Sequence, residues 1–151
     1  MSHVAAVELA IKDLSCLEAA CKEVGLELRK NQKSYRWYGR WVNDFNGANA
    51  AYKHGIDTKD YGKCDHAIGI PGNNSAYEIG VVKKPDGTYA LIWDFYAGGR
   101  GLEKVAGKNC QNVTKAYSMQ VAKKHLKAKG YSLQSTKTLS DGSVEMVFNS
   151  Y

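Results

Sequence analysis

Residues Tyr77–Tyr96, YEIGVVKKPDGTYALIWDFY, form the stretch of the chain that decides the fold. Two β-rich runs flank the tetrapeptide Lys84–Gly87, in which proline presets the backbone for a turn and glycine accepts a positive φ. The second run, residues 89–96, carries apolar side chains at both odd and even positions. A strand that is apolar on both faces belongs inside a sheet rather than at its edge. We therefore predict that this hairpin is the centre of the fold.

The N-terminal part of the chain reads as strand, helix and strand. The pattern predicts a strand over His3–Ile11, a helix over Leu14–Val24 and a longer strand over Leu26–Tyr38. Asp13 is placed to cap the start of the helix, and Gly25 is placed to end it. A helix that crosses between two strands predicts that those strands run parallel, with a right-handed connection.

The remaining segments complete the predicted order. Residues 42–63 have weak periodicity and are expected to form a long loop or an insertion. Cys64–Ile70 reads as a short strand, Asn112–Lys129 as a second helix, and residues 131–148 as a closing hairpin. The order β-α-β-β-β-β-α-β-β predicts a single α+β domain over residues 1–151. Its sheet is expected to be mixed and mainly antiparallel, with two helices packed on one face.

Composition sets the class of protein. A chain of 151 residues has the length of one ordinary domain, and no apolar run approaches the roughly 20 residues that span a bilayer. We therefore expect no membrane contact. The first residues lack the basic start of a signal peptide, so the expected location is the cytoplasm, or the host cytoplasm for a phage-encoded chain. The four cysteines form no CxxC pair, which predicts free thiols, no bound metal and no cofactor.

Several motifs resemble a known family. They are MSH followed by a strand and IKDLSCLEAACKEVGLEL, then YEIGVV and TYALIWDFY, and finally KAYSMQVAKKHLKAKGYSLQSTKTLSDGSVEMVF. Together they resemble the domain-of-unknown-function 1257 family, which includes the hypothetical chloroplast frame 35 proteins. The resemblance covers most of the chain outside residues 38–63, which look like an insertion in a bacterial or phage-type member. It implies a fold but no established activity, cofactor or active site.

Positive charge is concentrated in two parts of the chain. The formal net charge is +6, and residues 104–140 contain eight lysines and no acid. In residues 29–41, RKNQKSYRWYGRW, basic side chains alternate with aromatic ones. Basic residues neutralise phosphates and exposed aromatic rings stack on bases, so this pattern indicates a single-strand nucleic-acid surface. The candidate residues are Arg29, Lys30, Lys33, Tyr35, Arg36, Trp37, Arg40, Trp41, Lys123, Lys124 and Lys127.

Three weaker constellations are open to a functional or a structural interpretation. Gly98, Gly99, Arg100 and Gly101 could bind an anion through backbone N–H groups, although a flexible loop explains the same residues. Cys64 and His66 would share one face of a strand and could form a catalytic or metal-binding pair. Asp94, set between aromatic residues, could be a general base if buried, but a structural ion pair is the simpler interpretation.

The sequence therefore predicts a small non-enzymatic binding protein. Its first expected partner is single-stranded nucleic acid, bound through the basic and aromatic residues. The alternatives are an interaction or assembly subunit, of phage origin among other possibilities, that meets an acidic protein surface, and an enzyme of unknown reaction that uses His66 and Asp94.

Overall fold

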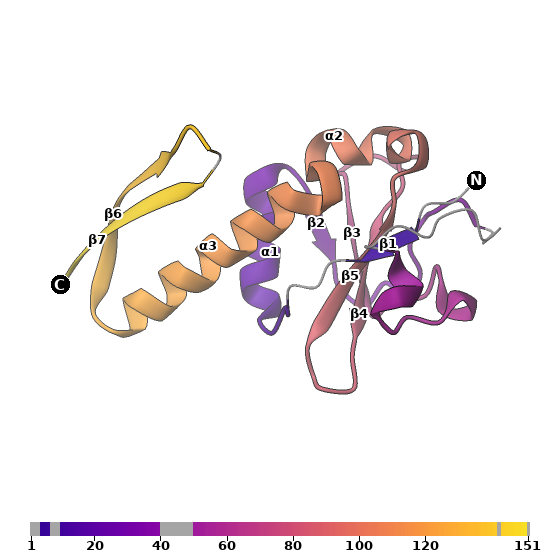
Figure 1. The fold of residues 1–151 in the computed structure, drawn as a ribbon, viewed down its shortest axis with the longest axis horizontal. Coiled ribbons are helices and arrows are strands. Elements are labelled where there is room, and N and C mark those ends of the chain that lie inside the picture. Colours follow the sequence, from indigo (N-terminus) through magenta and orange to yellow (C-terminus); the bar gives the residue numbers. More distant parts are fainter. Residues whose placement is uncertain (1–3, 7–9, 40–49, 142, 151) are drawn as a thin grey trace.

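The computed structural model describes residues 4–6, 10–39, 50–141 and 143–150, with the backbone alone at 144 and 150, and confirms the α+β class. Five strands form one sheet in the order β1-β5-β4-β3-β2, and every neighbouring pair is antiparallel (Figure 1). Two further strands, β6 and β7, pair only with each other within the described residues. The bounds are β1 Val4–Ala6, α1 Leu14–Val24, β2 Glu27–Arg29, β3 His66–Gly69, β4 Ile79–Lys83, β5 Tyr89–Asp94, α2 Leu102–Ala106, α3 Gln111–Ala128, β6 Tyr131–Thr138 and β7 Val144–Ser150.

The hairpin of β4 and β5 occupies the interior of the five-stranded sheet, as the sequence predicts. Its turn is closed by the Gly87 N–H, which donates to the Lys84 carbonyl at 2.9 Å, with Gly87 at φ 86°. Leu91 and Trp93 face the helices, and Ile92 packs on the opposite face. Both faces of β5 are therefore covered, which explains why its sequence is apolar at successive positions.

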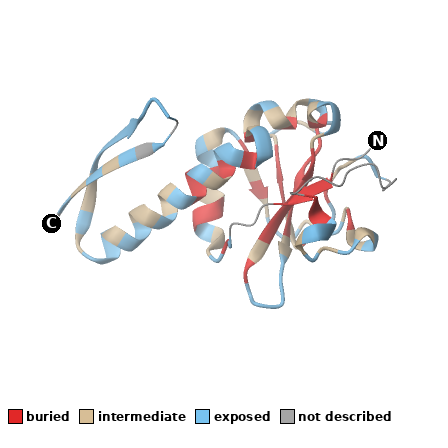
Figure 2. Cartoon of the chain, in the orientation of Figure 1, coloured by how far each residue is buried: buried red, intermediate tan, exposed pale blue. Residues whose placement is uncertain are grey.

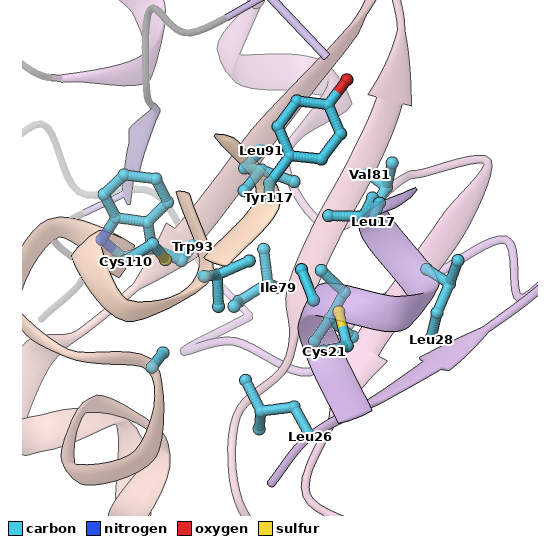
Figure 3. Close-up of a cluster of buried hydrophobic side chains, with 14 of the residues drawn as sticks. Leu17, Cys21, Leu26, Leu28, Ile79, Val81, Leu91, Trp93, Cys110 and Tyr117 are labelled. Carbon is cyan, nitrogen blue, oxygen red and sulfur yellow. The ribbon is translucent and has the colours of Figure 1, made fainter. Parts of the chain in front are cut away.

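Helix α1 begins and ends where its capping residues predict. The Asp13 carboxylate accepts the Cys16 N–H at 3.1 Å, and Gly25 ends the helix in the left-handed region at φ 89°. Buried side chains of α1, including Leu17 and Cys21, meet the sheet beside Tyr117 of α3 (Figure 3). The two long helices thus share one face of the sheet. All four cysteines are free thiols with buried side chains.

The predicted strand over Leu26–Tyr38 is too long, because only Glu27–Arg29 joins the sheet. Asn31 adopts φ 64°, a left-handed conformation that turns the chain out of the strand. The strands that flank α1 are also not parallel neighbours. β1 and β2 lie at opposite edges because β3 and the β4–β5 hairpin fill the space between them. The described sheets are consequently antiparallel rather than mixed.

A second apolar layer covers the face of the sheet that lies opposite the helices. Tyr35, Ala51 and Tyr61 pack there against the sheet residues Ala67 and Ile92. These side chains come from the segment after β2 and from residues 50–64, which hold two short 3₁₀ turns, Ala51–His54 and Thr58–Asp60. The described part of the expected loop is therefore a packed layer. Residues 42–49 lie outside the described residues.

The C-terminal arm, defined here as residues 118–150, extends away from the rest of the molecule (Figure 1). Helix α3 has 18 residues and is about 27 Å long. Its buried side chains, Val113, Ala116 and Tyr117, all lie in the first half. The second half and the hairpin it carries are mainly exposed (Figure 2). Because α3 leaves the core after Tyr117, it carries β6 and β7 too far to join the main sheet.

Candidate nucleic-acid interface

Two arginines of the basic stretch are bound to a buried carboxylate. Glu78, 1% exposed, precedes β4 and accepts the Arg29 Nη1 at 2.6 Å and the Arg36 backbone N–H at 2.9 Å. The Arg36 Nη1 lies 3.5 Å from Glu78 Oε1, the oxygen that accepts its own backbone N–H, and Gln32 Nε2 donates at 2.9 Å to Glu78 Oε2, the oxygen that Arg29 contacts. A buried carboxylate needs such partners, because an unpaired charge in an apolar interior is costly. Arg29 and Arg36 thus hold residues 29–36 against the sheet.

The guanidinium groups make further bonds to backbone carbonyls. Arg29 Nη2 donates to the Ile70 carbonyl at 3.0 Å, and Arg36 Nε donates to the Ala76 carbonyl at 2.8 Å. These bonds tie the loop between β3 and β4 to the same network. Residue patterns did not reveal this role for Glu78. The only signal was one acid at the entry to an otherwise apolar run.

The aromatic residues of the stretch lie mostly in the second apolar layer. Tyr35 is 3% exposed and covers Gly80, where a Cβ would come within 2.5 Å of the Tyr35 ring. Trp37 is half-buried and meets Tyr61 edge to face, with ring centroids 5.8 Å apart. Neither ring is fully exposed, as stacking on a base would require. Tyr38, 44% exposed, is the more accessible ring.

The remaining residues of the stretch differ in their surroundings. Lys30 and Lys33 are both exposed, and Lys30 Nζ lies 3.3 Å from the Glu18 carboxylate of α1. Arg40 and Trp41 lie outside the described residues. The basic stretch is therefore not one continuous exposed surface over its described part, 29–39.

Three of the four lysines of α3 lie together at a groove between α1 and α3. Lys123, Lys124 and Lys127 line a shallow cavity of about 310 Å³ with Ser15 and Gln120. Residues three and four positions apart share one helix face, so the sequence spacing alone places Lys127 beside both Lys124 and Lys123. A neighbouring cavity of about 290 Å³ shares Lys124 and adds His125. The structure thus brings these three predicted residues together.

The groove is fixed by contacts between the start of α1 and α3. Lys124 Nζ lies 2.6 Å from the Asp13 carboxylate, and the Tyr117 hydroxyl accepts the backbone N–H groups of Lys12 and Asp13 at 3.0 and 3.2 Å. The hydrogen bond from Lys124 holds the pKa of Asp13 well below its ordinary value, and the bonds from Ser15 and Cys16 act in the same direction. Lys123 and Lys127 have no acidic partner within the described residues.

The glycine-rich segment forms a left-handed turn. Ala97, Gly98, Gly99 and Arg100 all have positive φ, between 54° and 76°. The turn is held to the body, because the Gly99 carbonyl accepts the Tyr77 N–H at 3.0 Å and Arg100 lies over the Tyr77 ring at 5.5 Å. An open cavity of about 560 Å³ beside it is lined by Ala97, Gly98, Gly101, Glu103, Lys104 and Lys108. The turn is therefore a fixed structural element, and anion binding there stays a prediction.

Cys64 and His66 do not form a pair. Cys64 lies in the apolar layer that contains Tyr35, while His66 contacts Tyr89, which packs on the helix side of the sheet. The Cys64 thiol donates to the Gln32 carbonyl, and burial raises its pKa to about 12. His66 Nδ1 accepts the Asn31 N–H at 2.9 Å. No group of His, Cys, Asp or Glu among the described residues could hold a metal ion.

Asp94 is completely buried at the end of β5. Its carboxylate accepts the backbone N–H groups of Tyr38 and Tyr96, each at 3.1 Å. These bonds hold the backbone at Tyr38 and at Tyr96 to the end of β5, which is a structural role.

Among the described helices, none has the length and apolar character needed to cross a membrane.

A comparison with known families places the chain in one of them without assigning a role to the site. Residues 43–147 match the family described as "Protein of unknown function (DUF1257)". This match covers more than half of the chain, so the chain belongs to that family. The matched range includes residues 43–63, part of the segment that was expected to be an insertion. No curated protein and no solved structure matches the chain.

Proposed function

We propose that this member of the DUF1257 family is a non-enzymatic binding protein that contacts single-stranded nucleic acid through Lys123, Lys124 and Lys127. The observation that carries the proposal is the groove between α1 and α3, where these three lysines gather. Lys124 is paired with Asp13, but Lys123 and Lys127 lie four positions apart without an acidic partner among the described residues, so their mutual repulsion favours an anionic ligand that neutralises them. We call this set of residues the lysine groove.

The charge of the surrounding chain supports a polyanion rather than a small anion. Residues 104–140 contain eight lysines and no acid, and the sequence pI is about 9.1. A phosphate backbone extends past one groove and meets several lysines, and each contact releases counterions into solution. The open shape of the groove suits a strand lying along α3 better than an enclosed ligand.

The stretch of residues 29–41 has a smaller part in this proposal than the sequence suggested. Arg29 and Arg36 are bound to Glu78. Lys33 is the exposed basic residue of the described part of this stretch that has no acidic partner among the described residues. Arg40 and Trp41 remain candidate contacts. If Trp41 stacks on a base, Trp41→Ala should weaken binding by roughly 1–3 kcal/mol.

The candidate catalytic groups support a binding role over an enzymatic one. The His66 and Cys64 side chains are engaged by the backbone after β2, and the buried Asp94 carboxylate orders two backbone amides. A nucleophile or a general base would need to reach a substrate. Each of these groups has instead a hydrogen-bonding role within the fold.

An interaction or assembly subunit is the second candidate function. It is favoured by the exposed apolar side chains of the C-terminal arm, such as Val121 and Val147, 37% and 43% exposed. An acidic protein surface would complement the lysines of the same arm. The experiment below separates this candidate from the nucleic-acid proposal.

Fluorescence anisotropy with a short labelled DNA oligonucleotide tests the lysine groove. In the double variant Lys123→Ala and Lys127→Ala, affinity at low salt should fall. The slope of log K against log salt should decrease by about 1.4, because each lost phosphate contact on a single strand contributes about 0.7. The matched control is Lys83→Ala with Lys84→Ala, which removes the same charge from the exposed β4–β5 turn.

The outcomes are distinct. Equal losses in the two double variants would mean that binding follows net charge and not the groove. No binding of the wild type at 50 mM salt and micromolar protein would overturn the nucleic-acid proposal. Binding of a poly-glutamate peptide but not of DNA would favour the protein-partner candidate.

A further inference from the structure

The outer edge of β7 is an exposed strand edge, and it has few of the features that prevent such an edge from pairing with a strand of another molecule. β7 pairs with β6 on one side, and its other side makes no strand pairing within the described residues. Its sequence, VEMVFNS, has four apolar residues, one charge and no proline or glycine. Val147 at its midpoint is 43% exposed. Exposed apolar edges of this kind are templates for pairing with another strand.

The outer edge of β6 is protected in several ways that β7 lacks. A β-bulge in β6 between Leu133 and Ser135 interrupts the ladder that it forms with β7, Lys137 lies farther along the strand, and α3 contacts the strand. Bulges and lysines are devices by which native proteins block edge-to-edge pairing. The asymmetry between the two strands leaves β7 as the side on which the hairpin can extend.

A hairpin of two strands is at best marginally stable by itself in water, and three or more strands are needed for independent stability. α3 contacts β6, but the residues of both strands are mostly exposed (Figure 2). The described body therefore supplies the hairpin with little support. A further strand at the β7 edge would supply the missing pairing.

We propose that the occupant of this edge is β7 of a second copy of the chain, paired antiparallel about a two-fold axis at Val147. Val147 is the middle residue of the seven in β7, so this register pairs the whole strand. Met146 lies opposite Phe148 of the second copy and Glu145 opposite its Asn149. The two Met146–Phe148 pairs lie on the face of the sheet that carries Leu133, which is opposite Phe148 in the hairpin.

Charge favours a second copy in this register. The only charged residue of β7 is Glu145, and the two copies of it would lie about 14 Å apart along the sheet, beyond the screening length of about 8 Å. The order β6-β7-β7-β6 places each α3 beside an outer strand, so the lysine-rich helices stay away from the axis. A direct contact between two copies of α3 would instead oppose like charges.

This inference does not depend on the proposed nucleic-acid contact, because the axis at Val147 and the lysine groove use different residues. Pairing would give one assembly two lysine grooves, so a long strand could be held at two points. The dimer can therefore be tested without nucleic acid, and either proposal can fail alone.

Sedimentation equilibrium of the full chain, free of nucleic-acid absorbance, tests the dimer. Val147→Lys places two lysines opposite each other at the axis and should weaken dimerisation about tenfold. The matched control is Ser135→Lys, which adds the same charge one strand away, opposite Val147 in the hairpin, and should leave the dimer unchanged. Mixing Val147→Lys with Val147→Glu chains should restore a heterodimer, because the opposed charges then attract.

A second measurement needs no added charge. Val147→Cys should form an intermolecular disulfide under mild oxidation, because a residue on a two-fold axis faces its own copy, whereas Ser135→Cys should not. The four native cysteines are buried and should not compete. A monomeric wild type at about 100 μM, or equal crosslinking of the two cysteine variants, would overturn the proposal. Circular dichroism establishes that each variant is folded.

Discussion

Residues 29–37 and the C-terminal arm are both rich in basic residues, yet the fold gives their charges opposite uses. In the first region, Arg29 and Arg36 neutralise the buried Glu78 and hold a segment onto the sheet. In the arm, Lys123 and Lys127 reach a groove without an acidic partner among the described residues. The difference teaches that a run of basic residues indicates a binding surface only once its counter-charges are known.

The largest effect is expected in the core, at Trp93. Its side chain is 2% exposed among the helices and β4, and Trp93→Ala should lower the free energy of unfolding by about 3–5 kcal/mol. Phe148→Ala in the mostly exposed hairpin should cost less than about 1 kcal/mol, because little apolar surface is buried around it. Urea denaturation measures both changes. Similar losses of unfolding free energy in the two variants would contradict the view that the body is well packed and the arm is not.

Glu78→Ala should come next, with a loss of about 3 kcal/mol, because it breaks a buried ion pair, leaves the Arg36 guanidinium without its carboxylate and leaves Arg29 with Glu27 alone, at 2.9 Å. Glu145→Ala is the control, since Glu145 is an exposed acid of the arm and its loss should change stability by less than about 0.5 kcal/mol. A loss below about 1 kcal/mol for Glu78→Ala would falsify the view that residues 29–36 are held by this carboxylate. Increased DNA binding of the folded variant would show that the released arginines become available.

Tyr117 lies at the boundary between the body and the arm, and Tyr117→Phe should have an intermediate effect. Its hydroxyl is the acceptor for two backbone N–H groups at the start of α1, so its removal should cost about 1–3 kcal/mol. Tyr131→Phe, at an exposed position of β6, should have no measurable effect. If the two variants melted alike, the hydroxyl would not be what fixes α3 to α1.

The smallest effect concerns pH and the Lys124–Asp13 pair. Because Lys124 depresses the pKa of Asp13 in the folded state, their contribution is present above the ordinary value of 3.8 and is lost as the pH falls below it. Lys124 is 64% exposed, so solvent screens the pair and Lys124→Met should lower stability only slightly at pH 7. The gap from wild type should stay constant between about pH 5 and 7 and shrink below about pH 4.

Lys127→Met is the matched control for that measurement, since Lys127 lines the same groove without an acidic partner among the described residues. Urea midpoints of this variant should follow those of the wild type at every pH. A gap that persisted unchanged to pH 2 would mean that Lys124 stabilises the fold by some contact other than the Asp13 carboxylate.

Local sequence determined the elements whose causes lie within a few residues. Asp13 and Gly25 delimit α1, Gly87 closes the central hairpin, and the apolar pattern of residues 89–94 marks an interior strand. Helical spacing alone also placed Lys127 beside Lys123 and Lys124. Hydrogen bonds and side-chain periods of this range are set by the chain itself, so they can be recognised without the fold.

Only the tertiary structure decided what depends on partners distant in the sequence. Glu78 meets Arg29 across 49 positions, and Asp13 meets Lys124 across 111. The strand over Leu26–Tyr38 ends early because its aromatic residues find a second apolar layer, and the closing hairpin leaves the sheet because α3 is longer than the core it packs on. Burial and counter-charge are properties of the folded neighbourhood, and no local pattern of residues encodes them.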